Sequence, residues 1–209
     1  MIKNGKEIVL GGLTAAIAAA AGAQGAMAAD ADMAPAGDWT GLYAGVAAGM
    51  MGGQFPENES NDYKIGNDVV FGGFVGYNNQ VGSLVWGGEL ALQSGADSKG
   101  GSPDHDYSMN YIADAKVKLG MDAGSFMPYV FAGISGGQAT YGSDNNDYGF
   151  FGVNYGVGAE VMVTEQFSLG AELMGRTIID PYGCCDGSSS GGGDSRTQYQ
   201  GMLRAAFHF

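Results

Sequence analysis

The sequence predicts an all-β protein: an eight-stranded antiparallel transmembrane β-barrel, preceded by a cleavable signal peptide. Three observations predict it. The N-terminus has the composition of an export signal. Eight later segments alternate apolar and other residues with a period of two, which places successive strand side chains on opposite faces. The connections between these segments alternate between short and long, a pattern typical of outer-membrane barrels.

Residues 1–28 are interpreted as the signal peptide. Lys3 and Lys6 precede an apolar run rich in Ala and Gly, and Ala26 and Ala28 provide the small residues of a signal-peptidase site. The alternative is an uncleaved membrane anchor, because the run is slightly longer than a usual signal core. The small residues and the cleavage signature favour removal of the segment.

The remaining chain is long enough for one domain. We expect residues 29–38 to form a short N-terminal periplasmic segment and residues 39–209 to form the outer-membrane β-barrel domain. No later segment approaches the roughly 20 consecutive apolar residues that a membrane helix needs. The two cysteines are adjacent, which excludes a disulfide-stapled scaffold.

The predicted strands follow one another through this domain. They are Trp39 to Met50, Asp68 to Asn78, Leu84 to Gln93, Ser108 to Met121, Met127 to Gly137, Phe150 to Val163, Phe167 to Ile178 and the C-terminal stretch Tyr199 to Phe209. The second predicted strand is rich in glycine, and the sequence does not show which of its residues face outward. The fourth is the clearest, because Met109, Tyr111 and every second residue to Met121 are apolar. Asn110, Asp114, Lys116 and Lys118 lie between them, and no helix could keep those charges on one side.

The other strands are justified by the same alternation. Their expected apolar faces are Leu42, Ala44, Val46, Ala48 and Met50 in the first; Leu84, Trp86, Gly88, Leu90 and Leu92 in the third; Phe151, Val153, Tyr155, Val157, Ala159, Val161 and Val163 in the sixth; Phe167, Leu169, Ala171 and Leu173 in the seventh; and Tyr199, Gly201, Leu203, Ala205, Phe207 and Phe209 in the last. The fifth strand is the stretch MPYVFAGISGG.

Three connections are short, NNQVGS, DAGSF and TEQ, and four are long and rich in Gly, Ser, Asp and Asn. The long ones are Gly52 to Asn67, Ser94 to Tyr107, Thr140 to Gly149 and Ile179 to Arg196. Closing the sheet leaves no unpaired edge in the hydrocarbon. An even strand count places both termini on the same, periplasmic side.

The stretches DWTGLYAGVAAG and MPYVFAGISGG, with the terminal aromatic strand, resemble the small outer-membrane β-barrels of proteobacteria, related to the OmpA membrane domain and OmpX. The resemblance implies a location in the outer membrane of a Gram-negative bacterium and insertion by the barrel-assembly machinery. It also implies a C-terminal assembly signal, here Phe209, Phe207, Leu203 and Tyr199. OmpA's downstream peptidoglycan-binding domain has no counterpart, so cell-wall anchoring is not implied.

Charged residues occupy the faces predicted to point inward. They are Glu89, Asp114, Glu160 and Glu172 against Lys116, Lys118, Arg176 and Arg204, with His208 beside them. An eight-stranded barrel is just wide enough for side chains to fill, and an unpaired charge there is costly. We therefore expect a neutral, paired interior in which Glu172 forms a salt bridge with Arg204 on the neighbouring strand.

The sequence predicts no catalytic, cofactor or metal site. His105, Asp106 and Ser108 lack a nucleophile motif. The stretch from Asp144 to Gly149 has the rhythm of a calcium loop, but Tyr148 replaces an oxygen ligand. The glycines of GVNYGVGAE precede no helix, which excludes a dinucleotide fingerprint, and are expected to relieve crowding inside the barrel. A net charge of -13 argues against nucleic acid.

Cys184 and Cys185 fall in an outward loop at an oxidising location. They form a strained vicinal disulfide, cross-link two copies or have no function, and a metal is the least favoured option because two ligands make a poor zinc site.

The expected partners are outer-membrane lipid and lipopolysaccharide. The long loops are acidic and carry few cations, so contact with lipopolysaccharide phosphates would need bridging divalent cations. The alternative is that the acidity only keeps the loops solvated. The expected role is structural, in envelope integrity, contact or adhesion, without catalysis. The alternative role is a narrow porin-like pore for small solutes.

Overall fold

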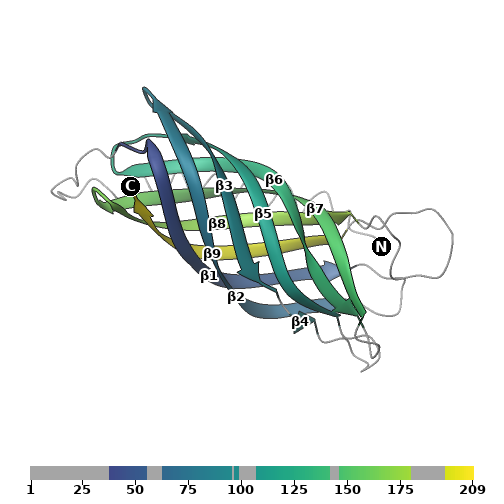
Figure 1. Cartoon of the computed structure of the whole chain (residues 1–209). Coiled ribbons are helices and arrows are strands. Elements are labelled where there is room, and N and C mark those ends of the chain that lie inside the picture. The colour runs from purple at the N-terminus through teal and green to yellow at the C-terminus, as the bar shows by residue number, and fades with distance from the viewer. Residues whose placement is uncertain (1–37, 56–62, 96, 99–106, 142–145, 180–195) are drawn as a thin grey trace, which may run out of the picture.

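The computed structural model describes residues 38–55, 63–95, 97–98, 107–141, 146–179 and 196–209. They form a tilted barrel of long antiparallel strands (Figure 1). The strands are β1 Gly41–Phe55, β2 Tyr63–Val81, β3 Leu84–Ser94, β4 Asp97–Ser98, β5 Tyr107–Met121, β6 Phe126–Tyr141, β7 Asn146–Thr164, β8 Phe167–Ile179 and β9 Arg196–His208. The predicted signal peptide and the paired cysteines lie outside the described residues.

Strand pairing closes the sheet. The order is β3-β2-β1-β9-β8-β7-β6-β5-β4, and β3 also pairs with β5. The first and last long strands, β1 and β9, pair from Tyr43 opposite His208 to Gln54 opposite Thr197. The prediction of a closed barrel with eight long antiparallel strands is therefore confirmed. In the described ranges, no helix has the length and apolar content needed to cross a bilayer.

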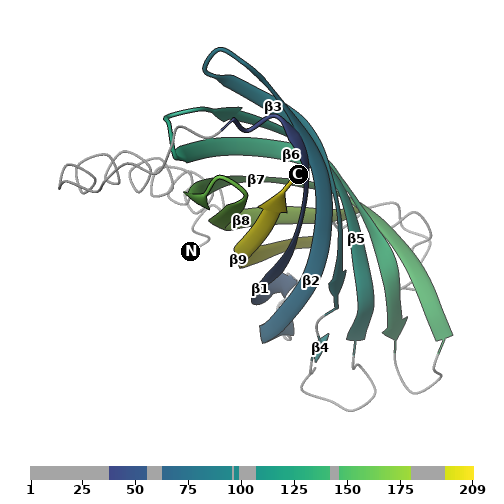
Figure 2. The ribbon, with the colours of Figure 1, turned by 60° about the vertical axis from the view of Figure 1, so that its left-hand side comes forward.

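The barrel has two different ends. The turns Gly82–Ser83, Asp122–Ser125 and Glu165–Gln166 lie at one end, which we call the turn end. The described chain also begins and finishes there, since the amide of Phe209 donates to the carbonyl of Leu42 at 2.9 Å. The opposite end, from which the long connections leave, is called the loop end (Figure 2). The expectation that both termini share one side is met by these described ends.

Several strands extend further toward the loop end than predicted. β1 continues past Met50 to Phe55, and β2 begins at Tyr63 rather than at Asp68. The short β4 lies inside the predicted loop between Ser94 and Tyr107 and pairs with the first residues of β5. Polar and glycine residues continue the hydrogen-bonded ladder at this end, so the apolar alternation stops before the strands do.

The outer wall is apolar on every long strand. Large side chains such as Leu90 and Val117 are 61% and 69% exposed. Among the side chains that the structure describes, the exposed charged residues are Asp38 and Glu165, and both lie outside the strands. This distribution is inverted relative to a soluble protein and suits a wall in contact with lipid. The predicted outward faces of β1, β3, β7, β8 and β9 are confirmed.

One residue of the clearest predicted strand faces the other way. Met109 was expected on the outer wall, but it is buried in the lumen. The pairing of β5 with β6 shifts between Met109 and Tyr111, so a β-bulge at Asn110 reverses the alternation there. Asn110 itself is exposed rather than inward-facing.

Glycines make room for rings inside the wall, as predicted for GVNYGVGAE. A Cβ on Gly158 would collide with the ring of Tyr129, and one on Gly76 would collide with the ring of Tyr43. Both rings lie against bare backbone at these positions. The two tyrosines thereby fit beside the charged side chains of a narrow barrel.

Candidate functional site

The candidate site is the lumen, the space enclosed by the barrel wall. All eight charged residues predicted to face inward lie there, and each is at most 5% exposed. The structure separates them into two groups. The lower group, nearer the turn end, contains Glu89, Glu160, Glu172, Lys116, Lys118 and Arg204. The upper group contains Asp114 and Arg176. Each group is neutral as a whole when all its members are ionised.

Glu89, on β3, is the centre of the lower group. The guanidinium of Arg204 approaches it with both terminal nitrogens, Nη1 at 2.9 Å and Nη2 at 2.5 Å. Lys116 Nζ lies 3.1 Å from Oε1 and Lys118 Nζ lies 3.5 Å from Oε2. The hydroxyl of Tyr43 donates to Oε2 at 2.9 Å. Three cations and a hydroxyl thus compensate the desolvation of one carboxylate.

The other two carboxylates share those cations. Glu172 accepts from Lys116 at 2.7 Å and from Arg204 at 2.9 Å, so the ion pair expected between neighbouring strands is present. Tyr129 also donates to Glu172, at 3.1 Å. Glu160 lies 3.1 Å from Lys118 and 3.7 Å from Arg204. Arg204 therefore connects all three acids.

Asp114 and Arg176 form the upper group. Arg176 Nη2 donates to both Asp114 oxygens, at 3.1 and 2.9 Å. Ser135 and Asn154 also donate to the carboxylate, and Arg176 Nε donates to the Ser135 hydroxyl at 3.0 Å. The remaining nitrogen, Nη1, reaches Gln200 Oε1 at 3.4 Å. A buried ion pair is stable only with such supporting hydrogen bonds.

Uncharged members of this network were not among the predicted site residues. They are Tyr43, Tyr129, Ser135, Asn154, Gln93, Gln198 and Gln200. The alternation that identified the inward charges also puts Tyr43, Gln93, Asn154 and Gln200 on the inward face, whereas Tyr129 and Ser135 lie on β6, which has no charged residue. Aromatic rings contribute as well: the Arg204 guanidinium lies 3.9 Å from the centroid of Phe74, and Lys118 Nζ lies 4.3 Å from that of Tyr129.

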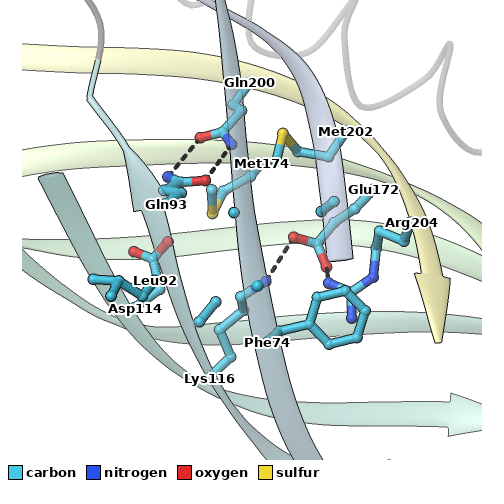
Figure 3. Close-up of a pocket in the computed structure, with 14 residues that line it drawn as sticks. Phe74, Leu92, Gln93, Asp114, Lys116, Glu172, Met174, Gln200, Met202 and Arg204 are labelled. Atoms are coloured by element: carbon cyan, nitrogen blue, oxygen red, sulfur yellow. Dashed lines mark hydrogen bonds and ion pairs between the residues drawn. The ribbon is translucent and has the colours of Figure 1, made fainter. Parts of the chain in front are cut away.

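Side chains fill the space between the two charge groups. Gln93 and Gln200 exchange two hydrogen bonds, at 2.7 and 3.1 Å, above the pairs of Glu172 with Lys116 and Arg204 (Figure 3). The cavity that these residues line has a volume of about 20 Å³. That is room for about one water molecule, so side chains rather than water fill the space beside Gln93 and Gln200.

Apolar layers lie on both sides of the polar network. At the loop end, Met51, Val70, Met109, Ile112, Ala139 and Ile178 pack together. At the turn end, Trp39 packs with Val85, Met127 and Met162. Within the described side chains, apolar residues therefore lie beyond the charged residues toward each end of the lumen.

Trp39 closes the turn end. Its side chain is 0% exposed although it precedes the first strand. Its indole nitrogen donates to Asp122 at 3.3 Å, and its amide donates to Gln80 at 2.9 Å. Gln80 in turn donates to Asp122 at 2.8 Å. The segment before β1 is thereby tied to the turn between β5 and β6.

The other predicted residues are placed as follows. Tyr199, Leu203, Phe207 and Phe209 all face outward, and the last two rings meet edge to face at 5.1 Å. His208 faces the lumen, 2.9 Å from the Ser168 hydroxyl. His105 and Asp106 lie outside the described residues, as do the first two residues of the calcium-like stretch, 144 and 145, whose remaining residues begin β7. Within the described ranges, no group of three or more His, Cys, Asp or Glu side chains is placed to hold a metal ion.

Comparison with known proteins gives consistent matches. The profile of the family described as "Outer membrane protein beta-barrel domain" matches residues 14–207. The chain is 32% identical over 178 residues to the 22 kDa outer membrane protein of Rhizobium leguminosarum bv. viciae, covering 78% of this chain and 81% of that protein. It is 28% identical to the 25 kDa outer-membrane immunogenic protein of Brucella abortus biovar 1, covering 64% of this chain and 63% of that protein.

Solved structures resemble the fold at lower identity. Neisserial surface protein A superposes with a TM-score of 0.55 at 15% identity, over 81% of this chain and 98% of that one. The attachment invasion locus protein of Yersinia pestis gives a TM-score of 0.50 at 14% identity, over 81% and 99% of the two chains. At this level of identity the likeness concerns the fold alone.

Proposed function

This chain belongs to the family of outer membrane protein beta-barrel domains, and from that premise we propose a structural and surface-contact role without solute transport or catalysis. The chain is located in the outer membrane of a Gram-negative bacterium. Short turns of bacterial outer-membrane barrels face the periplasm. The turn end, with Trp39, is therefore the periplasmic end, and the long connections project outward.

The filled lumen is the observation that carries this proposal. Charged side chains in a pore are held apart by water, whereas here Glu89 lies in direct contact with Arg204 and Lys116. Opening a path would require breaking several buried ion pairs, each of which leaves an uncompensated charge. The pore alternative therefore has less support than a sealed barrel, and the two functions differ in the ion current that they predict across a bilayer.

The absence of catalysis is part of the same proposal. Among the described residues, Ser168 and His208 form a hydrogen-bonded Ser–His pair in the lumen. Ser168 is only 1% exposed, so its hydroxyl cannot reach a substrate. A nucleophile must reach its substrate, and its base must be oriented by a third group. Trp39 covers this pair, with its ring 5.8 Å from that of His208. The contact is better explained as a satisfied buried hydrogen bond.

Assembly in the membrane supplies one partner. We propose that the barrel-assembly machinery reads the outward aromatic residues Phe207 and Phe209 of the last strand. Both rings are exposed on the outer wall, and β9 is the strand whose pairing with β1 closes the barrel. These residues are accessible to a folding factor before closure and to lipid after it.

Lipopolysaccharide is the proposed partner of the outward end. A Brucella relative is named an outer-membrane immunogenic protein, which fits exposure of loops at the cell surface. Asp68, directly after the predicted loop from Gly52 to Asn67, is not available for this contact, because it lies on β2 with a buried carboxylate oxygen. The acidic residues in the long connections at the loop end are Glu57, Glu59, Asp62, Asp104, Asp106, Asp144, Asp180, Asp186 and Asp194. Hard divalent cations would join such carboxylates to lipopolysaccharide phosphates.

Chelation tests this contact. Treating the purified protein with EDTA should release co-purifying lipopolysaccharide, because bridging cations are removed. Changing the acidic loop residues to their amides should abolish the EDTA effect. Asp38→Asn with Glu165→Gln, at the periplasmic end, is the matched control and should retain it. An EDTA effect that persists in the loop variant would mean that the acidic loop residues only keep the loops solvated and do not bind lipopolysaccharide through cations.

A further inference from the structure

A groove lies on the outer wall of the barrel, separate from the lumen. It has a volume of about 580 Å³ and crosses the neighbouring strands β1, β2, β3, β5 and β6. The outward side chains that line it are Leu42, Val75, Leu90, Ala115, Val117 and Ile134. Glu89 and Lys116 contribute only main chain, since their side chains form the ion pair inside the lumen. The groove is therefore apolar throughout.

A missing side chain creates this groove. Gly88 occupies an outward position on β3 between the large residues Trp86 and Leu90. Its partner in the register is Val117, and Leu90 stands opposite the small Ala115. A Cβ on Gly88 would have its nearest neighbour 3.8 Å away, so the glycine is not required by close packing of the backbone. A larger side chain at this position would therefore fit the fold and fill the groove.

We propose that this groove binds one acyl chain of a phospholipid. The groove is continuous with the apolar wall that contacts the hydrocarbon, and its lining offers no polar side chain to a protein or a headgroup. Val75, Leu90 and Ile134 lie in the middle part of β2, β3 and β6, so the groove falls within the span of the wall that contacts the hydrocarbon. Leu90, Val75 and Ile134 line the groove along three strands, and the groove is open toward the membrane.

Native mass spectrometry of the intact purified protein tests the proposal. The wild type should retain one phospholipid after gentle detergent extraction, and Gly88→Leu, which fills the groove, should lower that retention at least tenfold. Ala171→Leu is the matched control, because Ala171 is an exposed outward residue on β8, outside the groove. The control should retain lipid like the wild type.

Fluorescence provides a second readout that does not depend on extraction. Trp86 is 51% exposed on the outer wall beside Gly88, whereas the chain's other tryptophan, Trp39, is enclosed in the lumen. Phospholipids brominated on their acyl chains should quench Trp86 at lower molar ratios in the wild type than in Gly88→Leu. Equal retention and equal quenching in the two proteins would overturn the proposal. So would a lipid-free dimer of the wild type, which would identify a second copy as the occupant.

Discussion

Replacing Arg204 by alanine should lower the free energy of unfolding by about 3 to 5 kcal/mol. Arg204 is the cation that contacts all three acids of the lower group, Glu89, Glu160 and Glu172. Without it, three buried carboxylates share two lysines, and one negative charge has no compensation in a space closed to water. The midpoint of urea unfolding in lipid vesicles measures the loss.

Two further variants separate charge from packing. Arg204→Lys keeps the positive charge but loses the two-pronged contact with Glu89, so its stability should fall between those of the wild type and the alanine variant. Adding Glu160→Gln to Arg204→Ala restores a neutral group, and this double variant should be more stable than Arg204→Ala alone. An unchanged unfolding midpoint for Arg204→Ala would contradict the lumen network described above.

Trp39→Ala should cost a similar amount, about 3 to 5 kcal/mol, for a different reason. The substitution leaves a cavity between Val85, Met127 and Met162 and removes the hydrogen bond to Asp122. Asp38→Ala is the control in the same segment. Asp38 is exposed and accepts a hydrogen bond from the Thr40 amide, so its loss should cost less than about 1 kcal/mol.

Urea unfolding in vesicles again provides the comparison. If Trp39→Ala and Asp38→Ala unfolded at the same midpoint as the wild type, the segment before β1 would not close the barrel. Fluorescence gives a check on the fold, because Trp86 remains as the reporter of the lipid-facing wall.

Alternation in the sequence predicted the strands and most of their facing, because lipid on one side and a packed lumen on the other impose a strict period of two. It failed at Met109, where a single bulge reverses the pattern without any change in composition. It also stopped short at the loop end, where ladder hydrogen bonds hold polar residues such as those of β4 in strand geometry. Local irregularities of this kind have no periodic signal.

The sequence predicted which charged residues face the lumen, but not which of them contact one another. Glu172 and Arg204 lie on the neighbouring strands β8 and β9, so a simple register argument brings them together. Glu89 and Arg204 lie on β3 and β9, which β2 and β1 separate in the sheet. Their contact crosses the lumen and depends on the closure and stagger of the barrel. The first predicted strand began at Trp39, and its alternation puts Trp39 on the same face as Tyr43; β1 begins instead at Gly41, and the contact of Trp39 with the turn at Asp122 was not predicted.

Single-channel recording in planar bilayers tests the central claim, a lumen sealed by ion pairs between two apolar layers, most directly. The purified wild-type protein, with its insertion verified and a general porin as the positive control, should give no current steps above the lipid background. Discrete, reproducible steps from the wild type would contradict the sealed lumen and would favour a pore for small solutes.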